Sequence, residues 1–338
     1  MYDRALTDKE VSNNYNGSIT NSNLLFSFDF KDGSREEYKN NKGVIIPEDD
    51  ILAYYVYVPR YEYKIWETGT SATGKEQEIE INLQNKYDNK SNGTQIGEYL
   101  THPAFTFGDT ELNGIWVGKF ETTGTVDSPT IKPNVTSLRN QNVSTQFATA
   151  QLLGDTTYGI NSSKTDSHMM KNSEWGAAAY LSHSKYGINS EIRLNNNSNF
   201  ITGCGANTAN ASSSTNCEIV YGSVSEYPQS TTGNILGIFD MSGGSWERVM
   251  GNYNDTIGSS GFSAMHDSKY YDKYTTTDML TACNGGICYG QSLSETNNWY
   301  SDTNVFVSSN SSWLLRGGRY IIDVGAGAFG YGTLLEEL

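Results

Sequence analysis

The four cysteines are the residues of this sequence best placed to do chemistry. They are Cys204, Cys217, Cys283 and Cys288. Zinc sites need two closely spaced pairs of ligands, and only Cys283 and Cys288 have such a spacing. Two local disulfides, Cys204–Cys217 and Cys283–Cys288, are the preferred expectation for an extracellular protein. Free, buried thiols are the alternative, because an intracellular chain of 338 residues needs no covalent staples.

Histidines and glycines suggest two other kinds of site. The four histidines lie on separate segments: His102, His168, His183 and His266. Their spacing does not match a metal site, so surface or capping roles are expected. Residues 320–330 resemble a strand leading into the G-x-G-x-x-G dinucleotide motif, which needs a following helix and an acidic residue about twenty positions on. Only eight residues follow Gly330, so no nucleotide site is expected.

The composition limits the classes of partner. The chain has 23 Lys+Arg and 38 Asp+Glu, a net charge of −15, which disfavours nucleic acid and anionic lipid. Only 18% of residues are charged, whereas 34 are glycine and 23 tyrosine, so strands, turns and loops should outnumber long charged helices. No run of 18 apolar residues is present, so we expect no membrane insertion.

Several strands and two helices must position any site. Aromatic and β-branched patterns predict strands over 24–30, 54–58, 61–66, 76–84, 114–121 and 218–222. Helices are predicted over 142–153, with Ser144 as N-cap, and over 170–186, with Ser173 as N-cap. Small and aromatic residues, including Trp175, fall on one side of the second helix, as in a helix that lies on a sheet.

Three phrases, in the same order, resemble the formylglycine-generating enzymes and related sulfatase-modifying-factor domains of the C-type lectin fold. Residues 114–123 (GIWVGKFETT) are similar to the family strand F-x-I-x-x-x-E-V-T, and residues 174–180 (EWGAAAY) to the helix E-W-E-x-A-A. Residues 232–247 (TGNILGIFDMSGGSWE) resemble G-N-x-x-G-L-x-D-M-x-G-N-V-W-E, followed at 313–318 by WLLRGG. The resemblance implies a loop-rich α+β C-type lectin fold with small antiparallel sheets and two main helices.

The resemblance does not carry the family's activity with it. The enzymes oxidise a substrate cysteine with two cysteines beyond the R-G-G phrase, whereas here that phrase begins at Arg316 and no cysteine follows Cys288. Related sulfoxide-forming enzymes use an iron site built from histidines, which this sequence does not space as ligands. We therefore expect a protein that is not an enzyme.

Calcium is the one cofactor that the resemblance leaves open. Residues around the third phrase include calcium ligands in the enzymes, and Asn234, Asp240 and Glu247 are retained here, while Gly244 replaces the second Asn. A scaffold without metal is the favoured expectation. Glu247 and Arg316 are expected to form a buried, charge-assisted pair.

The end of the chain resembles the variable proteins of diversity-generating retroelements, which are C-type lectin domains with a rewritten C-terminal binding surface. The implied fixed scaffold is Gly325, Ala326, Ala328 and Phe329. The implied binding positions are Arg319, Tyr320, Ile321, Ile322, Asp323, Val324, Gly327, Gly330 and Tyr331. Aromatic neighbours are expected at Trp299, Tyr300 and Trp313.

This resemblance implies a non-enzymatic ligand-binding or adhesion module for a protein or glycan, outside the cell on a bacterial surface or a phage virion. Two alternatives come from other classes. One is a degenerate enzyme of the sulfatase-modifying type, and the other is a structural part of a surface fibre or tail.

The N-terminal residues suggest a neighbouring domain. Thr7 and Glu10 have the spacing of a capping box, and residues 2–15 (YDRALTDKEVSNNY) resemble the final strand and helix of laminin-G or concanavalin-like domains. The expected organisation is a stub at 1–18, a strand and linker at 19–50 and the lectin-like domain at 51–338, tethered through a missing N-terminal region. The alternative for residues 2–15 is an ordinary frayed helix.

Overall fold

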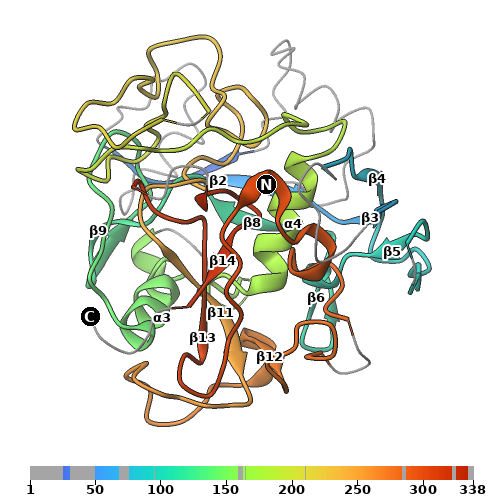
Figure 1. The fold of residues 1–338 in the computed structure, drawn as a ribbon. Helices are drawn as coiled ribbons and strands as arrows, with labels where there is room; N and C mark the ends of the chain where they lie inside the picture. The colour runs from blue at the N-terminus through green and yellow to red at the C-terminus, as the bar shows by residue number, and fades with distance from the viewer. Residues whose placement is uncertain are drawn as a thin grey trace.

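The computed structural model describes residues 26–30, 50–67, 76–94, 96–158, 163, 165–209, 211–283, 287–321 and 325–333, with the backbone alone for 26–30. The expected stub at 1–18, with its capping box, lies outside the described residues. The described chain forms a loop-rich α+β fold with two α-helices and several small sheets (Figure 1). This confirms the general architecture expected from the sequence.

The first sheet has β2 (Ile51–Pro59) at its centre, between β1 (Phe26–Phe30) and β8 (Gly114–Gly118), and both pairings are antiparallel. Most residues of β2 are buried, as its run of aromatic and β-branched residues predicts. The second sheet pairs β3 (Tyr61–Lys64) with β4 (Glu80–Leu83) and β5 (Leu100–Thr101).

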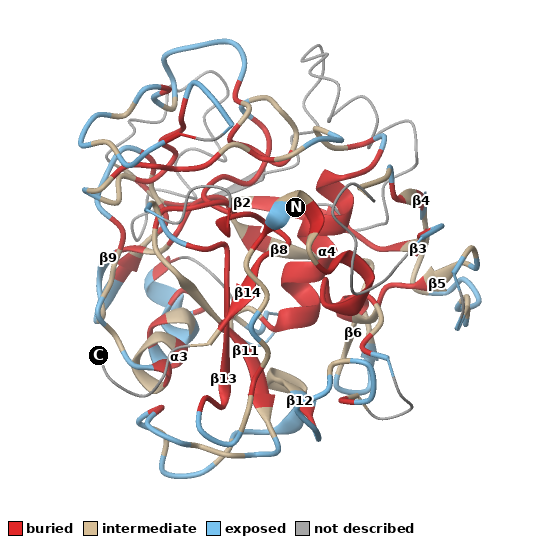
Figure 2. Cartoon of the chain, viewed as in Figure 1, coloured by how far each residue is buried: buried red, intermediate tan, exposed pale blue. Residues whose placement is uncertain are grey.

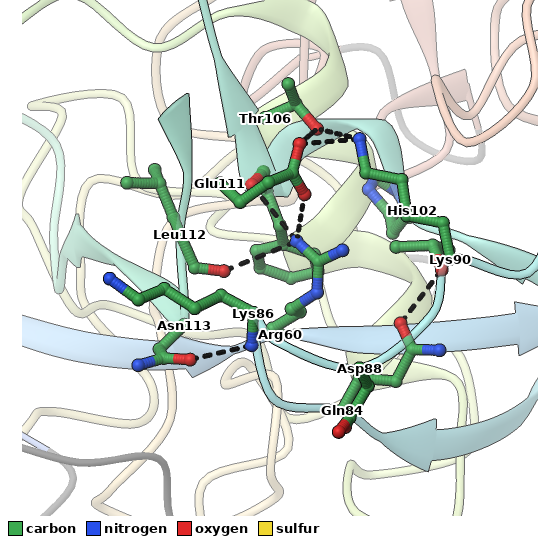
Figure 3. Close-up of polar contacts among 12 residues, drawn as sticks. Arg60, Gln84, Lys86, Asp88, Lys90, His102, Thr106, Glu111, Leu112 and Asn113 are labelled. Carbon is green, nitrogen blue, oxygen red and sulfur yellow. Dashed lines mark hydrogen bonds and ion pairs between the residues drawn. The ribbon is translucent and has the colours of Figure 1, made fainter. Parts of the chain in front are cut away.

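An ion-pair cluster holds the corner between the first two sheets (Figure 3). The guanidinium of Arg60 is buried and lies 2.8 Å from the carboxylate of Glu111, to which Lys90 also pairs at 2.5 Å. Glu111 belongs to the short hairpin of β6 (Thr106–Phe107) and β7 (Thr110–Glu111). The cluster therefore ties this hairpin to the start of β3.

The third sheet carries the C-terminal segment. Its order is β12 (Asp272–Tyr274), β11 (Glu247–Tyr253), β13 (Trp313–Arg316) and β14 (Tyr331–Gly332). The β11–β12 pair is parallel, unlike the antiparallel pairs expected throughout. A separate antiparallel pair is formed by β9 (Thr123–Thr125) and β10 (Ser128–Thr130).

The two helices are α3 (Val143–Leu152) and α4 (Asn172–Ser182), close to the predicted ranges. Every residue of α4 is buried, so the prediction of a one-sided, amphipathic helix is wrong (Figure 2). Gly176 makes this burial possible, because a Cβ there would overlap the backbone of Gly290. Short 3₁₀ turns lie at Pro103–Phe105, Thr156–Tyr158, Ser268–Tyr270, Ser294–Thr296 and Trp299–Ser301.

Both predicted N-caps are wrong. Asn142 caps α3 by accepting from the backbone N–H of Thr145, and the Ser144 hydroxyl donates to the same amide oxygen. Lys171 occupies the cap position of α4, where its backbone N–H donates to Glu174 at 2.8 Å. Each cap lies two positions before the predicted one. At α3 the side chain of Asn142 satisfies a free N–H group, whereas at α4 the N–H of Ser173 donates to the carboxylate of Asp272 in β12 at 2.6 Å.

Both expected disulfides, Cys204–Cys217 and Cys283–Cys288, are present, and no cysteine is free. They indicate an oxidising, extracellular compartment. The predicted strand at 218–222 is wrong, because only an isolated bridge between Ile219 and Gly205 forms there. Within the described ranges, no helix has the length and apolar character needed to cross a bilayer.

Candidate ligand-binding surface

The C-terminal loop between β13 and β14 is held by hydrogen bonds from Arg316, which is fully buried. Its Nε donates to the amide oxygen of Asn172 at 2.7 Å, and its other nitrogens donate to the carbonyls of Gln291, Phe329 and Gly330. Burial lowers the pKa of Arg316 to about 10, which leaves it charged at neutral pH. One cation therefore holds both ends of the loop.

The predicted binding positions separate into buried and exposed groups. Gly327, Gly330 and Tyr331 are buried, so their expected exposure is wrong. The Tyr331 hydroxyl donates to Asn297 at 2.9 Å, and a Cβ at position 327 would overlap the carboxylate of Asp302. The cause is the pairing of Tyr331 with Arg316, which brings the end of the loop back into the sheet.

Of the expected aromatic neighbours, Trp299 and Trp313 are also buried, while Tyr300 is half-buried. The expected scaffold positions are buried: Gly325, Ala326, Ala328 and Phe329. Ile322, Asp323 and Val324 lie outside the described residues.

Three neighbouring binding positions reach solvent. Arg319 and Ile321 are exposed, Ile321 by 42%, and Tyr320 is half-buried. The ring of Tyr320 meets Phe200 edge-on at 4.9 Å, and the guanidinium of Arg139 lies 3.7 Å from the centre of the Phe200 ring. We call these five residues the C-terminal surface. It combines an exposed cation, an exposed apolar side chain and a half-buried cluster of one cation and two aromatic rings.

Local backbone geometry places these residues together. Gly317 and Gly318 have φ of 77° and 70°, so the chain turns sharply after β13, and a Cβ at position 318 would overlap Ala326. The Tyr320 N–H then donates to the carbonyl of Gly244 at 3.1 Å. Phe200 has a φ of 56°, an uncommon value for a residue with a side chain.

Three carboxyl groups lie together in the neighbouring core. Asp240 is 2% exposed and accepts from the N–H of Gly203, and Glu121 accepts from the N–H of Ser245 at 2.8 Å. Burial, reinforced by Asp240, raises the pKa of Glu121 to about 8, and burial raises that of Asp240 to about 6. Burial and these two neighbours raise the pKa of Glu247 well above its ordinary range. Protons therefore neutralise part of the group near neutral pH.

The expected pair between Glu247 and Arg316 is wrong. The two residues are opposite one another in β11 and β13, but within the described chain no ion pair joins them. The guanidinium of Arg316 instead binds Asn172 and the backbone carbonyls of the C-terminal loop. Carbonyl oxygens supply enough acceptors to satisfy a guanidinium without a carboxylate.

The candidate calcium ligands do not fit a metal site. Asn234 turns its amide oxygen to its own loop, where it accepts from the N–H of Leu236 at 2.8 Å. The space of the family's second Asn is filled by Glu121, because a Cβ at Gly244 would overlap that carboxylate. Within the described residues, no group of three His, Cys, Asp or Glu side chains could hold a metal ion.

The histidines have the structural roles expected of them, with one exception. His102 caps a 3₁₀ turn and His183 follows the last residue of α4, while His266 is exposed. His168 instead pairs with Glu174 and Asp166, which outweigh burial and raise its pKa to about 10.

Sequence analysis missed Arg139 and Phe200 as members of the surface. Phe200 did carry a signal, because it is the single aromatic residue in the Asn- and Ser-rich stretch 195–216. Nothing in the sequence connects Arg139 with this stretch, since the two meet through tertiary packing.

No protein-family model matches this chain, and no curated protein matches it either. Its function is therefore inferred from its own residues and their geometry.

Proposed function

We propose that this protein is a non-enzymatic ligand-binding module that contacts its ligand through the C-terminal surface. The observation that carries the proposal is the contact of Arg139 with Phe200 and of Phe200 with Tyr320, next in sequence to exposed Arg319 and Ile321. Tyrosine, arginine and neighbouring apolar groups are the residues that most often dominate binding energy at interfaces.

The scaffold beneath this surface supports the same proposal. Arg316 and the buried scaffold positions fix the described ends of the loop, so less conformational entropy is lost there when a ligand binds. Two guanidinium groups on a chain of net charge −15 favour a ligand that offers oxygen acceptors, as acidic glycans and acidic protein surfaces do.

The proposed setting is a bacterial cell surface or a phage virion. The supporting features are the phrase at 232–247 and the layout of 316–332, both similar to the variable proteins of diversity-generating retroelements. The proposed fold is correspondingly the C-type lectin fold of the sulfatase-modifying-factor type.

The test is to screen the purified protein against a glycan array and a displayed-peptide library, and then to measure a selected ligand with a triple variant, Arg319→Ala, Tyr320→Ala and Ile321→Ala. We expect the triple variant to bind at least about 30-fold more weakly, because residues of these types each contribute on the order of 2 kcal/mol at binding hot spots. Its unfolding midpoint should be almost unchanged, because these side chains are at least partly exposed.

A matched control is the double variant Lys86→Ala and Tyr87→Ala, which removes a cation and a stacked ring from another part of the chain. It should bind like the wild type. Undiminished binding by the triple variant would overturn the proposal.

Variability of this surface has a separate test in the genome. We expect a reverse-transcriptase gene and a near-duplicate of the codons for residues 313–332 close to the gene. Finding neither would contradict diversification of the loop.

A further inference from the structure

A cavity of about 380 Å³ opens beside the second sheet, away from the residues of the C-terminal surface. Its wall includes Ile65, which follows β3, and Leu100 of β5. Its floor is formed by Ser294 and Glu295, in the 3₁₀ turn Ser294–Thr296. The volume is within the range of pockets that hold small organic molecules.

The rim of this cavity is apolar and open to solvent. Ile96, Leu280 and Ile287 line it, and they are 52%, 41% and 37% exposed. Each costs free energy when left in water, and together they converge on one opening. The rim therefore suits the apolar body of a ligand.

The floor holds a carboxylate that lacks a cation. Glu295 is 5% exposed and accepts from the hydroxyls of Tyr63 at 2.8 Å and Tyr180 at 2.9 Å, and from the N–H of Gly290 at 2.5 Å. No ion pair to it is found among the described residues. Glu111 differs, because it is paired with both Arg60 and Lys90 (Figure 3).

Burial raises the pKa of Glu295 to about 7, even though its three donors favour the ionised form. A cation in the cavity would supply the missing counter-charge and hold the carboxylate ionised.

Two more features of the lining favour a cationic hydrogen-bond donor. The Ser294 hydroxyl is buried at the cavity and has no hydrogen-bond partner among the described residues. Exposed Glu98 adds a second carboxylate to the lining, which contains no Lys, Arg or His. The site thus combines negative charge, a free hydroxyl and apolar walls.

We propose that this cavity binds a small primary amine with an apolar body, whose ammonium group meets Glu295 and Ser294 while its body lies against Ile65, Leu100 and the apolar rim. The ammonium donates to the carboxylate oxygen and to the serine hydroxyl, which satisfies both groups. The cavity lining contains no residue of the C-terminal surface, so either proposal can fail without the other.

Isothermal titration calorimetry with three probes of one shape tests the proposal. Tryptamine carries an ammonium group, tryptophol a hydroxyl and indole-3-propionate a carboxylate on the same ring system. We expect tryptamine to bind at least about tenfold more tightly than tryptophol, because a charge-assisted bond in a buried site outweighs a neutral one. Indole-3-propionate should not bind measurably, because the cavity is acidic.

The variant Glu295→Gln keeps the shape and a carbonyl acceptor but removes the charge. It should bind tryptamine and tryptophol about equally, and it is checked for a cooperative unfolding transition. The matched control Glu111→Gln lowers stability through its lost ion pairs but should keep the preference for tryptamine.

If Glu295→Gln does not fold, Leu280→Lys at the exposed rim provides the second variant, and its added cation should weaken tryptamine binding about tenfold. The triple variant of the C-terminal surface should bind tryptamine like the wild type, so the two proposals are tested separately. Absence of tryptamine binding at millimolar concentration, or a preference for tryptamine that survives Glu295→Gln, would overturn the inference.

Discussion

The C-terminal surface and the cavity over Glu295 carry opposite charges, and they differ in how far those charges are exposed to solvent. Arg319 is exposed and Arg139 is half-buried, and the guanidinium of Arg139 lies on an aromatic ring. The carboxylate of Glu295 is buried beneath an apolar rim and is held by two tyrosine hydroxyls. The first arrangement can contact a broad ligand with many weak interactions, whereas the second can select one small charged group.

A single stretch of chain, residues 290–297, connects the two regions. Gly290 donates to Glu295 within the cavity floor, while Gln291 accepts from Arg316 and Asn297 accepts from Tyr331 below the C-terminal loop. The two sites therefore share support, although they share no residue that would touch a ligand.

The largest effect is expected from Arg316→Ala, which should break the support of both regions at once. The variant leaves the amide oxygen of Asn172 and the carbonyls of Phe329 and Gly330 without the guanidinium donor, and the Gln291 carbonyl keeps the Asn172 amide as a donor. We expect a loss of about 3–5 kcal/mol in the free energy of unfolding. Urea titration measures this loss. Arg319→Ala, on the exposed part of the same loop, should change stability by no more than about 0.5 kcal/mol. Equal effects of the two variants would show that the buried cation does not fasten the loop.

Removing the two disulfides one at a time should affect the two regions differently. Cys204 and Cys217 are 13 positions apart and Cys283 and Cys288 are 5 apart, so loop entropy predicts losses of about 3 and about 2 kcal/mol on replacement by serine. Thermal unfolding measures both losses. The Cys283–Cys288 variant alone should also weaken tryptamine binding, because Leu280, Ile287 and Tyr289 of the cavity flank that bridge. Weaker tryptamine binding in the Cys204–Cys217 variant would contradict the separation.

A smaller effect is expected from pH. The pKa of Glu121 is raised to about 8 in the folded chain, so the folded state binds more protons than the unfolded state between about pH 4.5 and pH 8. The contribution of Glu121 to stability must then fall as pH rises through this range, by roughly 2 kcal/mol between about pH 6 and pH 8.5. Chemical denaturation at a series of pH values measures the slope of stability against pH, and Glu121→Gln should make this slope less steep.

Glu295, whose pKa is raised to about 7, adds a similar decline in stability as pH rises. Bound tryptamine should reverse this decline, because its ammonium group favours the ionised carboxylate. A slope of the opposite sign would contradict burial as the dominant influence on these carboxyl groups.

Local sequence patterns predicted the structural features that are determined by residues close together in the sequence. Both disulfides, both helices and the central strand at 54–58 were correct, because short spacing and side-chain type determine them. Burial of Gly327 and Tyr331 could not be predicted, because it depends on the pairing of β14 with β13 and on Arg316.

The two proposed sites show the same limit. Arg319, Tyr320 and Ile321 are consecutive in the sequence and were predicted, whereas their partners Arg139 and Phe200 come from distant loops. The cavity was missed entirely, because residues near positions 65, 100 and 290 meet there through tertiary contacts alone. A buried glutamate without a cation has no signature in the sequence.

The shared stretch 290–297 places the two sites in one thermodynamic cycle. If a ligand on the C-terminal surface alters the affinity for tryptamine by some factor, tryptamine must alter the affinity for that ligand by the same factor. A titration at either site thus measures the coupling free energy for both. An amine bound in the cavity would in this way alter the affinity of the proposed C-terminal surface for its ligand.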